Sequence, residues 1–328
     1  MKIGKLAEPI LIRSVIKQLS HRRDEVLSGP AVGQDCGVIE VEPDEVIVMS
    51  TDPITGTTKD IGAHSVYITV NDLAAAGSEP IGIMLSIMLP ERISEQKLRI
   101  MMQDVEDTCA KLNIEVIGGH TEITNVVNQP VITVTGVGKT KKSELMITSQ
   151  IKANQDIVVT KWIGLEATAI LAKEKEEELL KRYPKELVDT ARDFASYLSV
   201  VEEAKIAKAH GASAMHDITE GGVFGALWEM ASSADLGLEV DLKAIPIRQE
   251  TVEVCEYFGL NPYQIMSSGS MMIATDDGAG LVRKLEEKGI HGSVVGRTND
   301  GNDRILMNGE EQRYLDRPQP DELYKVMG

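Results

Sequence analysis

The sequence has few cysteines, and it has no long apolar run. The three cysteines among 328 residues are Cys36, Cys109 and Cys255, and no C-x-x-C pair occurs. An odd and widely spaced set argues against a disulfide framework and against a zinc site. The best apolar run, 81–90, is about half of the roughly 18 residues that a membrane-spanning helix needs. We therefore expect a protein of the reducing cytoplasm with no membrane span and, because Glu8 and Pro9 interrupt residues 1–19, with no secretory signal.

Basic residues are scarce relative to acidic ones. Lys and Arg total 34 and Asp and Glu total 51, which gives a net charge of −17. This charge repels a phosphate backbone, so we expect no nucleic-acid partner. A nucleotide bound to such a chain would arrive with divalent cations that bridge carboxylates and phosphates.

The remaining composition is that of an ordinary globular protein, with 42% hydrophobic and 26% charged residues. At roughly 150 residues per domain, the length indicates two domains. Apolar residues at helical spacing predict helices over 11–19, 63–74, 98–112, 165–173, 223–234 and 280–288. Short β-branched runs predict strands at 46–49, 114–117, 131–137, 156–160, 238–242 and 270–275. The expected fold class is α+β.

Residues 139–155 lose apolar periodicity and are mainly polar. Such a stretch is typical of a linker. We therefore expect a boundary near residue 148, with domains 1–148 and 149–328.

Five acidic residues occur in contexts that suit a metal site. Four of them follow an apolar strand-like run or adjoin a glycine pair, namely Asp35, Asp52, Glu122 and Asp217, and Asp72 is placed on a predicted helix with its carboxylate off the buried face. Mg²⁺ prefers carboxylates, waters and substrate phosphates. A single acid in such a place is more often a helix cap or a turn residue. Five together favour a magnesium site.

Two glycine pairs adjoin these acids. Gly118 and Gly119 follow a predicted strand near Glu122, and Gly221 and Gly222 open a predicted helix near Asp217. Backbone N–H groups at such places can contact phosphate oxygens without a side chain in the way. The alternative is that glycine only permits a tight turn or a positive φ.

Other nucleotide and hydrolase motifs are incomplete. The stretch 136–140 (GVGKT) lacks the first glycine of a P-loop, because residue 133 is Thr133, and Lys141 breaks the dinucleotide pattern. We expect it to be a strand and a turn. No G-x-S-x-G elbow occurs. His120 and His216 could contact phosphate or transfer a proton, although a satisfied loop histidine is more common. The sequence identifies no catalytic base.

Six blocks in order resemble a known superfamily. The blocks are VGQDCGVIE, MSTDPITG, VNDLAAAGSEPIG, GGHTEIT, HDITEGGVFGALWEMA and SSGSMMIA. They are similar to the aminoimidazole ribonucleotide synthase (PurM-like) superfamily and, within it, to the HypE-like hydrogenase expression/formation proteins. The resemblance implies a two-domain PurM-like fold. In this fold an N-terminal α/β domain pairs in a homodimer around a shared β-barrel, and ATP and Mg²⁺ bind in a cleft.

The resemblance also implies roles for residues of this sequence. It assigns Asp35, Asp52, Asp72, Glu122 and Asp217 to metal, and Asn71, Gly118, Gly119, His120, Thr121, Gly221 and Gly222 to the nucleotide. The implied chemistry is ATP-dependent phosphorylation or activation of an oxygen-containing small substrate. The acceptor is unidentified.

One departure concerns the HypE-like tail. Such proteins carry a cysteine in a mobile C-terminal tail, whereas the last cysteine here is Cys255 and the sequence ends DELYKVMG. We therefore expect a tail-less HypE-like enzyme that does not carry a carbamoyl group on its own tail. The alternative is a non-catalytic, nucleotide-binding assembly or regulatory protein with hydrogenase-maturation proteins as partners.

Overall fold

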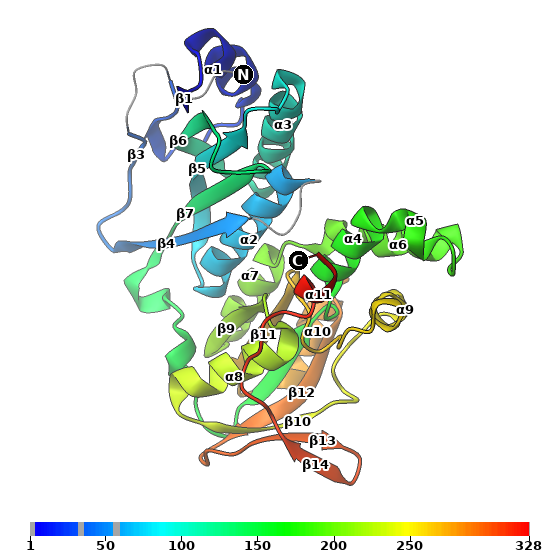
Figure 1. The fold of residues 1–328 in the computed structure, drawn as a ribbon. Coiled ribbons are helices and arrows are strands. Elements are labelled where there is room, and N and C mark those ends of the chain that lie inside the picture. Colours follow the sequence, from blue (N-terminus) through cyan, green and yellow to red (C-terminus); the bar gives the residue numbers. More distant parts are fainter. Residues whose placement is uncertain (1–3, 32–35, 55–59, 328) are drawn as a thin grey trace. The chain divides into compact units, whose positions relative to one another are not determined.

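The computed structural model describes residues 4–31, 36–54 and 60–327. Its contacts divide the chain into two compact units (Figure 1). The first unit comprises Met1–Leu73 and Ser78–Leu145, and the second comprises Ala74–Gly77 and Met146–Gly328. Each unit has its own sheet and its own helices.

The first unit is built on a five-stranded sheet in the order β1-β6-β5-β7-β4. Its strands are β1 (Gly4–Lys5), β4 (Glu45–Ile54), β5 (Glu79–Pro90), β6 (Glu115–Thr124) and β7 (Val131–Lys141). Strands β5 and β6 are parallel, and the other pairs are antiparallel. A separate two-stranded sheet joins β2 (Val26–Ser28) and β3 (Val38–Ile39).

Helices cover one face of this sheet. They are α1 (Glu8–Ser14), α2 (Ile61–Ala75) and α3 (Glu95–Leu112), with short 3-10 turns η1 (Ile16–Gln18) and η2 (Lys142–Glu144). The predicted stripe of α3 is confirmed, because Leu98, Met102, Val105 and Cys109 are all 0% exposed. Helix α2 packs closely on β7, where a Cβ on Gly136 would lie 2.7 Å from Thr69 Cγ2. The glycine of the P-loop-like stretch therefore serves helix–sheet packing, and β7 continues through the predicted turn to Lys141.

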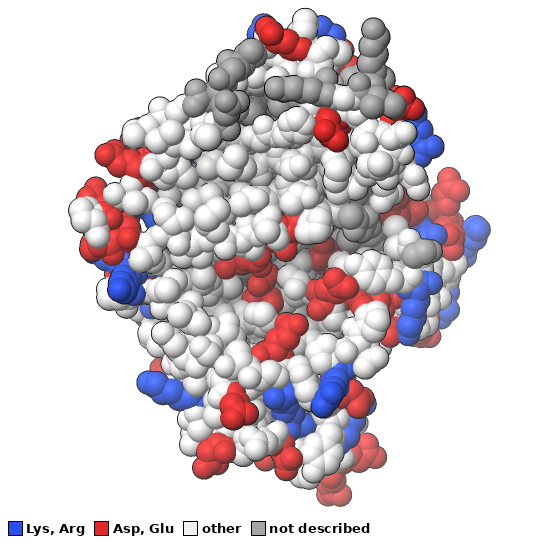
Figure 2. Space-filling model, turned by 60° about the vertical axis from the view of Figure 1, so that its left-hand side comes forward, with Lys and Arg blue, Asp and Glu red and all other residues white. Residues whose placement is uncertain are grey.

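The opposite face of the sheet is open at β4, the edge strand. Ile47 and Met49 on this face are 43% and 62% exposed. Thr51 and Pro53 continue the same face and are exposed too, whereas the alternate residues of β4 are partly or fully buried. Figure 2 shows a broad area without Lys, Arg, Asp or Glu in the upper half of its view. An edge strand with apolar side chains outside is a surface on which another chain can pair.

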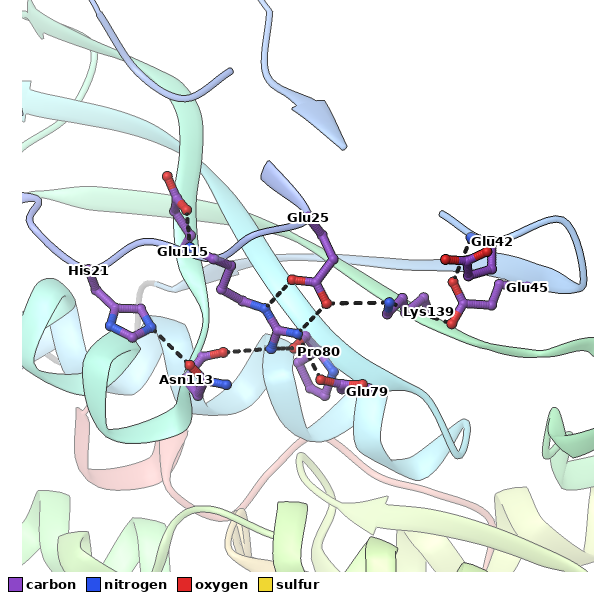
Figure 3. Close-up of polar contacts among 10 residues, drawn as sticks. His21, Glu25, Glu42, Glu45, Glu79, Pro80, Asn113, Glu115 and Lys139 are labelled. Carbon is purple, nitrogen blue, oxygen red and sulfur yellow. Dashed lines mark hydrogen bonds and ion pairs between the residues drawn. The ribbon is translucent and has the colours of Figure 1, made fainter. Parts of the chain in front are cut away.

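A network of ion pairs ties the segment before β2 to the sheet (Figure 3). Arg23 Nη2 lies 2.6 Å from Glu25 Oε1 and 2.8 Å from Glu79 Oε1. Lys139 Nζ lies 3.3 Å from Glu25 and 3.5 Å from Glu45. The Arg23 guanidinium lowers the pKa of Glu25 to about 2. Glu25 is therefore ionised throughout the neutral range.

The second unit is built on a seven-stranded sheet in the order β14-β13-β10-β12-β8-β11-β9. Its strands are β8 (Asp156–Thr160), β9 (Ala214–Ile218), β10 (Gly237–Asp241), β11 (Ser270–Thr275), β12 (Gly292–Asn299), β13 (Arg304–Asn308) and β14 (Glu311–Tyr314). Only the β10–β13 pair in this sheet is parallel among the described residues. With its mixed sheets and separate helices, the chain has the expected α+β class.

Four apolar clusters of described residues fix the helices of this unit, and the smallest consists of Leu165, Ala169 and Phe194. Its helices are η3 (Thr148–Gln150), α4 (Leu165–Glu174), α5 (Glu176–Leu179), α6 (Lys185–Asp193), η4 (Phe194–Tyr197), α7 (Val201–His210), α8 (Gly222–Ala234), α9 (Gln249–Phe258), α10 (Gly278–Glu286) and α11 (Tyr324–Met327). Helix α8 packs on the sheet through Val223 and Leu227. Helices α7 and α10 pack together with Ala74 and Ala75, the last residues of α2. Helices α4, α6 and α9 form the third cluster with Leu323.

The predicted helices and strands are present in the structure, but one helix is broken and some strands are longer than predicted. The helix predicted over 11–19 is broken, since α1 ends at Ser14 and a 3-10 turn follows. The β-branched Val15 and Ile16 at the break have low helix propensity. The strands predicted at 46–49 and 114–117 are longer, because pairing with β7 and β5 extends them past their apolar runs. No helix of the described chain has the length and apolar character needed to cross a bilayer.

Candidate functional site

Two of the predicted metal-binding acids meet in the first unit. Asp52 lies on β4, and Asp72 lies near the end of α2. The Ser50 hydroxyl on β4 contacts both, since it donates a short hydrogen bond to Asp72 Oδ2 and lies 3.4 Å from Asp52 Oδ2. All three side chains are partly buried. One serine thus holds two carboxylates at the same point between strand and helix.

The register of the sheet separates Glu122 from this pair. Ser50 and Asp52 pair with Gly136 and Val134, and so face α2. Glu122 pairs with Met88, whose neighbour across the sheet is Val131 on the open face. His120 projects from this face as well, with its Nε2 atom 3.3 Å from Glu122 Oε2. Within one chain, Glu122 therefore lies on the other side of the sheet from Asp52 and Asp72.

Three of the acids lie inside strands, where the sequence indicated strand ends. Asp52, Glu122 and Asp217 are internal residues of β4, β6 and β9. Asp52 and Glu122 differ from the expectation because the strands predicted at 46–49 and 114–117 end before the ladders do, whereas no strand was predicted before Asp217. Asp35 lies outside the described residues. Asn71, which neighbours Asp72 on α2, is fully buried.

The first glycine pair lies in the middle of β6. Gly119 has φ +151°, and a Cβ there would lie 2.2 Å from the Leu85 carbonyl oxygen. The register of β5 and β6 shifts between Ile83 and Met84, next to this position. A strand irregularity with close backbone approach is a usual reason for glycine. Thr121, two residues on, is buried, whereas Gly119 and His120 are exposed.

An open pocket borders this glycine pair on the helix-covered side. The apolar side chains of Leu11, Val15 and Met102 line it together with the strand segment 118–121. Ligand pockets of small molecules are mostly apolar, with a few polar groups. The lining of this opening combines apolar side chains with backbone polar groups of the strand.

In the second unit, Asp217 lies on the edge strand β9 and is 6% exposed. His216, which points to the other side of the strand, lies 3.0 Å from Glu229 Oε2 on α8. The predicted histidine is therefore held by a carboxylate of its own unit.

The second glycine pair begins α8, as predicted, but both residues are buried. The Gly221 N–H donates to Asp321 Oδ2 at 2.8 Å, and the Gly222 N–H donates to the Thr219 carbonyl at 3.1 Å. Gly222 has φ +63°, and a Cβ there would lie 2.7 Å from the Tyr263 carbonyl oxygen. Both N–H groups thus have protein acceptors.

The acidic residues of the first unit suit a magnesium ion that is bound together with a nucleotide. No three His, Cys, Asp or Glu side chains in the described part of the chain form a group that could hold a metal ion. Mg²⁺ usually takes one or two protein carboxylates and completes its shell with waters and substrate phosphates. The Asp52–Asp72 pair provides such carboxylates without a preformed cage, so a magnesium ion that arrives with a nucleotide fits it.

Sequence reasoning missed two residues. Ser50 stands two positions before Asp52, and the alternation of a strand places both on one face, so this signal was present. Asp321 gave no signal, because a lone acid after a proline near other polar residues is typical of any turn.

Two family models match the chain. One describes an AIR synthase related protein, N-terminal domain, and matches residues 33–140. The other describes an AIR synthase related protein, C-terminal domain, and matches residues 152–307. Together they cover most of the sequence in order.

Curated relatives extend this similarity. A hydrogenase expression/formation protein of Methanocaldococcus jannaschii is 26% identical over 98% of this chain and 97% of its own length. The carbamoyl dehydratase HypE of Rhodobacter capsulatus is 26% identical over 78% of this chain and 76% of its own. A thiamine-monophosphate kinase of Pyrococcus horikoshii is 25% identical over 76% of each chain. Two of these relatives are named as enzymes.

Solved structures show the same fold. The hydrogenase maturation protein HypE in complex with ATP matches with a TM-score of 0.81 and 16% identity over 98% of this chain and 97% of that chain. HypE in a complex with HypF matches with a TM-score of 0.71 and 16% identity over 83% of this chain and 90% of that chain. The chain therefore has the fold of these HypE structures.

Proposed function

Since the chain belongs to the AIR synthase-related (PurM-like) family, we propose that it is an ATP- and Mg²⁺-dependent enzyme that phosphorylates or activates an oxygen-containing small substrate. The observation that carries the proposal is the pair Asp52 and Asp72, joined by the Ser50 hydroxyl. Named relatives include a carbamoyl dehydratase and a kinase, and HypE has been solved with ATP.

In this proposal Asp52 and Asp72 hold the magnesium ion, and Asp35 and Asp217 belong to the same set. A bound magnesium ion offsets the charge on the transferred phosphate. Asn71, which is fully buried beside Asp72, is assigned to the nucleotide in this proposal. Glu122 faces the open side of the sheet, so a role for it in metal binding requires a ligand on that face.

The nucleotide contacts are assigned to the segment 118–121 and to Gly221 and Gly222. The pocket beside Gly118 and Gly119 supports this, because its apolar wall suits the base of ATP and its strand offers backbone polar groups. Phosphate binding at Gly221 would require its N–H to leave the Asp321 carboxylate. We therefore assign the nucleotide mainly to the first unit.

We further propose that residues 1–148 form the ATP-binding and dimerising domain and that 149–328 form the C-terminal domain. The open sheet face at β4 supports a homodimer with a shared barrel, since Ile47 and Met49 are exposed there. A second copy that covers this face would remove both apolar side chains from water.

A second candidate is a non-catalytic nucleotide-binding protein of hydrogenase maturation. The similarity to a hydrogenase expression/formation protein and to HypE in complex with HypF favours it. Steady ATP turnover in a cellular metabolite extract, lost in Asp217→Ala, would support the enzyme and count against this candidate.

Calorimetric titration with ATP, with and without Mg²⁺, tests the proposal. We expect Mg²⁺-dependent binding that weakens at least about 100-fold in Asp72→Asn, because the ion loses one of its two paired carboxylates. Asp107→Asn is the control, since Asp107 is exposed on α3. Equal affinity in wild type and Asp72→Asn would contradict the proposed site.

A further inference from the structure

The carboxylate of Asp321 is buried at the start of α8. Asp321 is 2% exposed. Its Oδ2 atom accepts the Gly221 N–H at 2.8 Å, and its Oδ1 atom accepts the Leu323 N–H at 2.9 Å. The Met266 backbone N–H is a third donor. A single carboxylate therefore joins three backbone segments of the second unit.

The neighbouring residues strengthen the same junction. The Glu322 N–H donates to the Gln264 carbonyl at 3.2 Å, and Glu322 Oε2 accepts the Asn261 N–H at 3.2 Å. Leu323 is 0% exposed within the cluster of α4, α6 and α9. By contrast, the preceding residues 316–320 are all exposed. Residues 321–323, which we call the Asp321 clamp, are thus the anchored part of an otherwise exposed segment.

The clamp braces the residues around Asp217. Gly221 follows Asp217 by four positions and caps α8 with φ +81°. Met266 belongs to a loop that also contacts this segment, since the Ser267 N–H donates to the Thr219 carbonyl at 3.4 Å. Loss of the Asp321 carboxylate would leave the N–H groups of the buried residues Gly221 and Leu323 without their acceptor, which favours local opening.

We propose that Asp321 is a positioning residue that clamps residues 321–327 to the start of α8, and that release of the clamp loosens segment 217–222. The functional part of this inference rests on the proposed function, because Asp217 belongs to the proposed metal set. Hydrogen bonds of 2.8 Å and 2.9 Å place the backbone N–H groups of Gly221 and Leu323 on the Asp321 carboxylate, so its role is to position these segments.

Charge at this site makes the clamp sensitive to pH. Burial raises the pKa of Asp321 to about 6, and Glu220 acts in the same direction, whereas the three backbone N–H groups lower it. The other titratable groups nearby are Glu166 on α4, Tyr324 on α11 and Cys255 on α9. Burial raises the pKa of Tyr324, with Glu220 and Asp321 as further causes. Glu322 of the clamp is a further acid nearby, and its Oε1 atom lies 2.6 Å from Nζ of Lys325 on α11.

The raised pKa of Asp321 determines whether docking of residues 321–327 strengthens or weakens as the pH rises. A docked carboxyl with a pKa of about 6 binds a proton more readily than a solvated one at its ordinary 3.8. Docking of residues 321–327 is therefore most favourable below pH 3.8, the ordinary pKa of the carboxyl, and it weakens as the pH rises through about 6. Between pH 5 and pH 8, the docking equilibrium should shift about tenfold toward the open form.

Hydrogen exchange of the full chain without nucleotide tests the clamp itself. We expect Asp321→Ala to raise exchange at least about tenfold in peptides covering 219–223 and 264–268. Asp316→Ala is the matched control, because Asp316 is exposed five residues earlier in the same segment. Unchanged exchange in Asp321→Ala would overturn the proposal.

The pH profile separates a proton-sensitive clamp from a merely structural contact. After correction for intrinsic exchange, wild type should open about tenfold more at pH 8 than at pH 5, and Asp321→Asn, which does not titrate, should lose this dependence. The Asn variant also covers the case in which Asp321→Ala does not fold. An identical profile in wild type and Asp321→Asn would overturn the inference.

ATP titration then distinguishes the two proposals. Weaker Mg²⁺–ATP binding in Asp321→Ala than in Asp316→Ala would support the positioning role. Raised exchange with unchanged ATP affinity, while Asp72→Asn abolishes binding, would overturn the positioning role and leave the proposed function intact. Absence of ATP binding by wild type would refute the proposed function and with it the positioning role, whereas the exchange experiment alone would still decide the clamp.

Discussion

The two glycine pairs have the same sequence and adjoin acidic residues, but they have different structural roles. Gly118 and Gly119 lie inside a strand, where Gly119 lets two backbones approach. Gly221 and Gly222 start a helix, and their N–H groups bond to acceptors of the same unit. A glycine pair beside an acid therefore does not specify a phosphate loop. The register and the acceptors around the pair decide what it does.

The units differ in electrostatics as well. In the first unit a cation, Arg23, holds Glu25 ionised and lowers its pKa to about 2. In the second unit Asp321 is buried among backbone N–H groups, and burial raises its pKa to about 6. The first contact loses strength as pH falls, and the second loses strength as pH rises.

The largest effect is expected for Gly119→Ala. Its Cβ would lie 2.2 Å from the Leu85 carbonyl oxygen at a φ of +151°, so strand β5 would have to move. We expect a loss of about 4 kcal/mol in the free energy of unfolding of the first unit, measured by urea denaturation with circular dichroism. In the control Gly118→Ala, the new Cβ would lie 3.3 Å from the flexible Met84 Cε, and the loss should stay below about 1 kcal/mol. Equal losses of unfolding free energy in Gly119→Ala and Gly118→Ala would mean that the close approach of the two backbones at Gly119 does not determine the cost.

Gly222→Ala should destabilise the second unit by about 3 kcal/mol, from a positive φ and from overpacking. Its Cβ would lie within 2.8 Å of the Tyr263 and Ile265 backbones. Gly221→Ala has a positive φ but no atom closer than 3.7 Å, so it should cost about 1–2 kcal/mol. The two tryptophans, Trp162 and Trp228, both lie in the second unit, so their fluorescence reports its unfolding. A larger loss in Gly221→Ala than in Gly222→Ala would contradict this order.

Replacement of Arg23 tests the electrostatic difference between the two units. Arg23 is 8% exposed and bridges Glu25 and Glu79. We expect Arg23→Gln to lower the stability of the first unit by about 2 kcal/mol at pH 7. Glu25 has a pKa lowered from 4.5 to about 2, so its contribution is present above pH 4.5 and is lost as pH falls through 2.

The difference between Arg23→Gln and wild type should therefore shrink between pH 7 and pH 3. Hydrogen exchange of the β5 amides at both pH values measures it. Arg99→Gln is the control, because Arg99 is 51% exposed and should cost less than about 0.5 kcal/mol. A difference that grows toward low pH would refute the assignment to Glu25.

The smallest effect concerns Ser50, on which the acid pair of the first unit depends. Ser50→Ala removes the donor shared by Asp52 and Asp72 and leaves both carboxylates in place. Because the proposed magnesium ligands remain, we expect Mg²⁺–ATP affinity to fall only about 3- to 10-fold. Thr51→Val is the matched control, because Thr51 is adjacent to Ser50 but faces Thr135 on the other side of the strand. If Ser50→Ala lowered the affinity less than Thr51→Val, the hydrogen-bonded pair Asp52 and Asp72 would not contribute to ATP binding.

Helices were predictable where their periodicity was complete. The stripe from Leu98 to Leu112 identified α3 because its apolar residues recur at helical spacing, although Glu106 and Thr108 are buried in this helix as well. The family resemblance identified the two-domain fold, which the family models and the HypE structures confirm. The assigned site residues and the boundary near residue 148 stay predictions.

The partition of the acids between the two faces of the sheet was beyond the sequence. It depends on the pairing register of the strands. The glycines Gly118 and Gly119 mark the irregularity beside Ile83 and Met84, but they do not specify the face on which each acid lies. The role of Asp321 depends on contacts with residues about 50 to 100 positions away. Such contacts follow from tertiary structure, which a scan of neighbouring residues does not detect.

The end of α2 has a consequence for synthesis on the ribosome. Ala74 and Ala75 pack with residues that extend from Met146 to Leu285, although the rest of their helix belongs to the first unit. At roughly 5 to 20 residues per second, translation from residue 75 to residue 285 takes about 10 to 40 s. Once residue 145 is made, the first unit is complete in sequence, but the last turn of α2 still lacks most of its partners. The nascent chain therefore exposes a small apolar helix end, which is a natural site for chaperone binding until the second unit is synthesised.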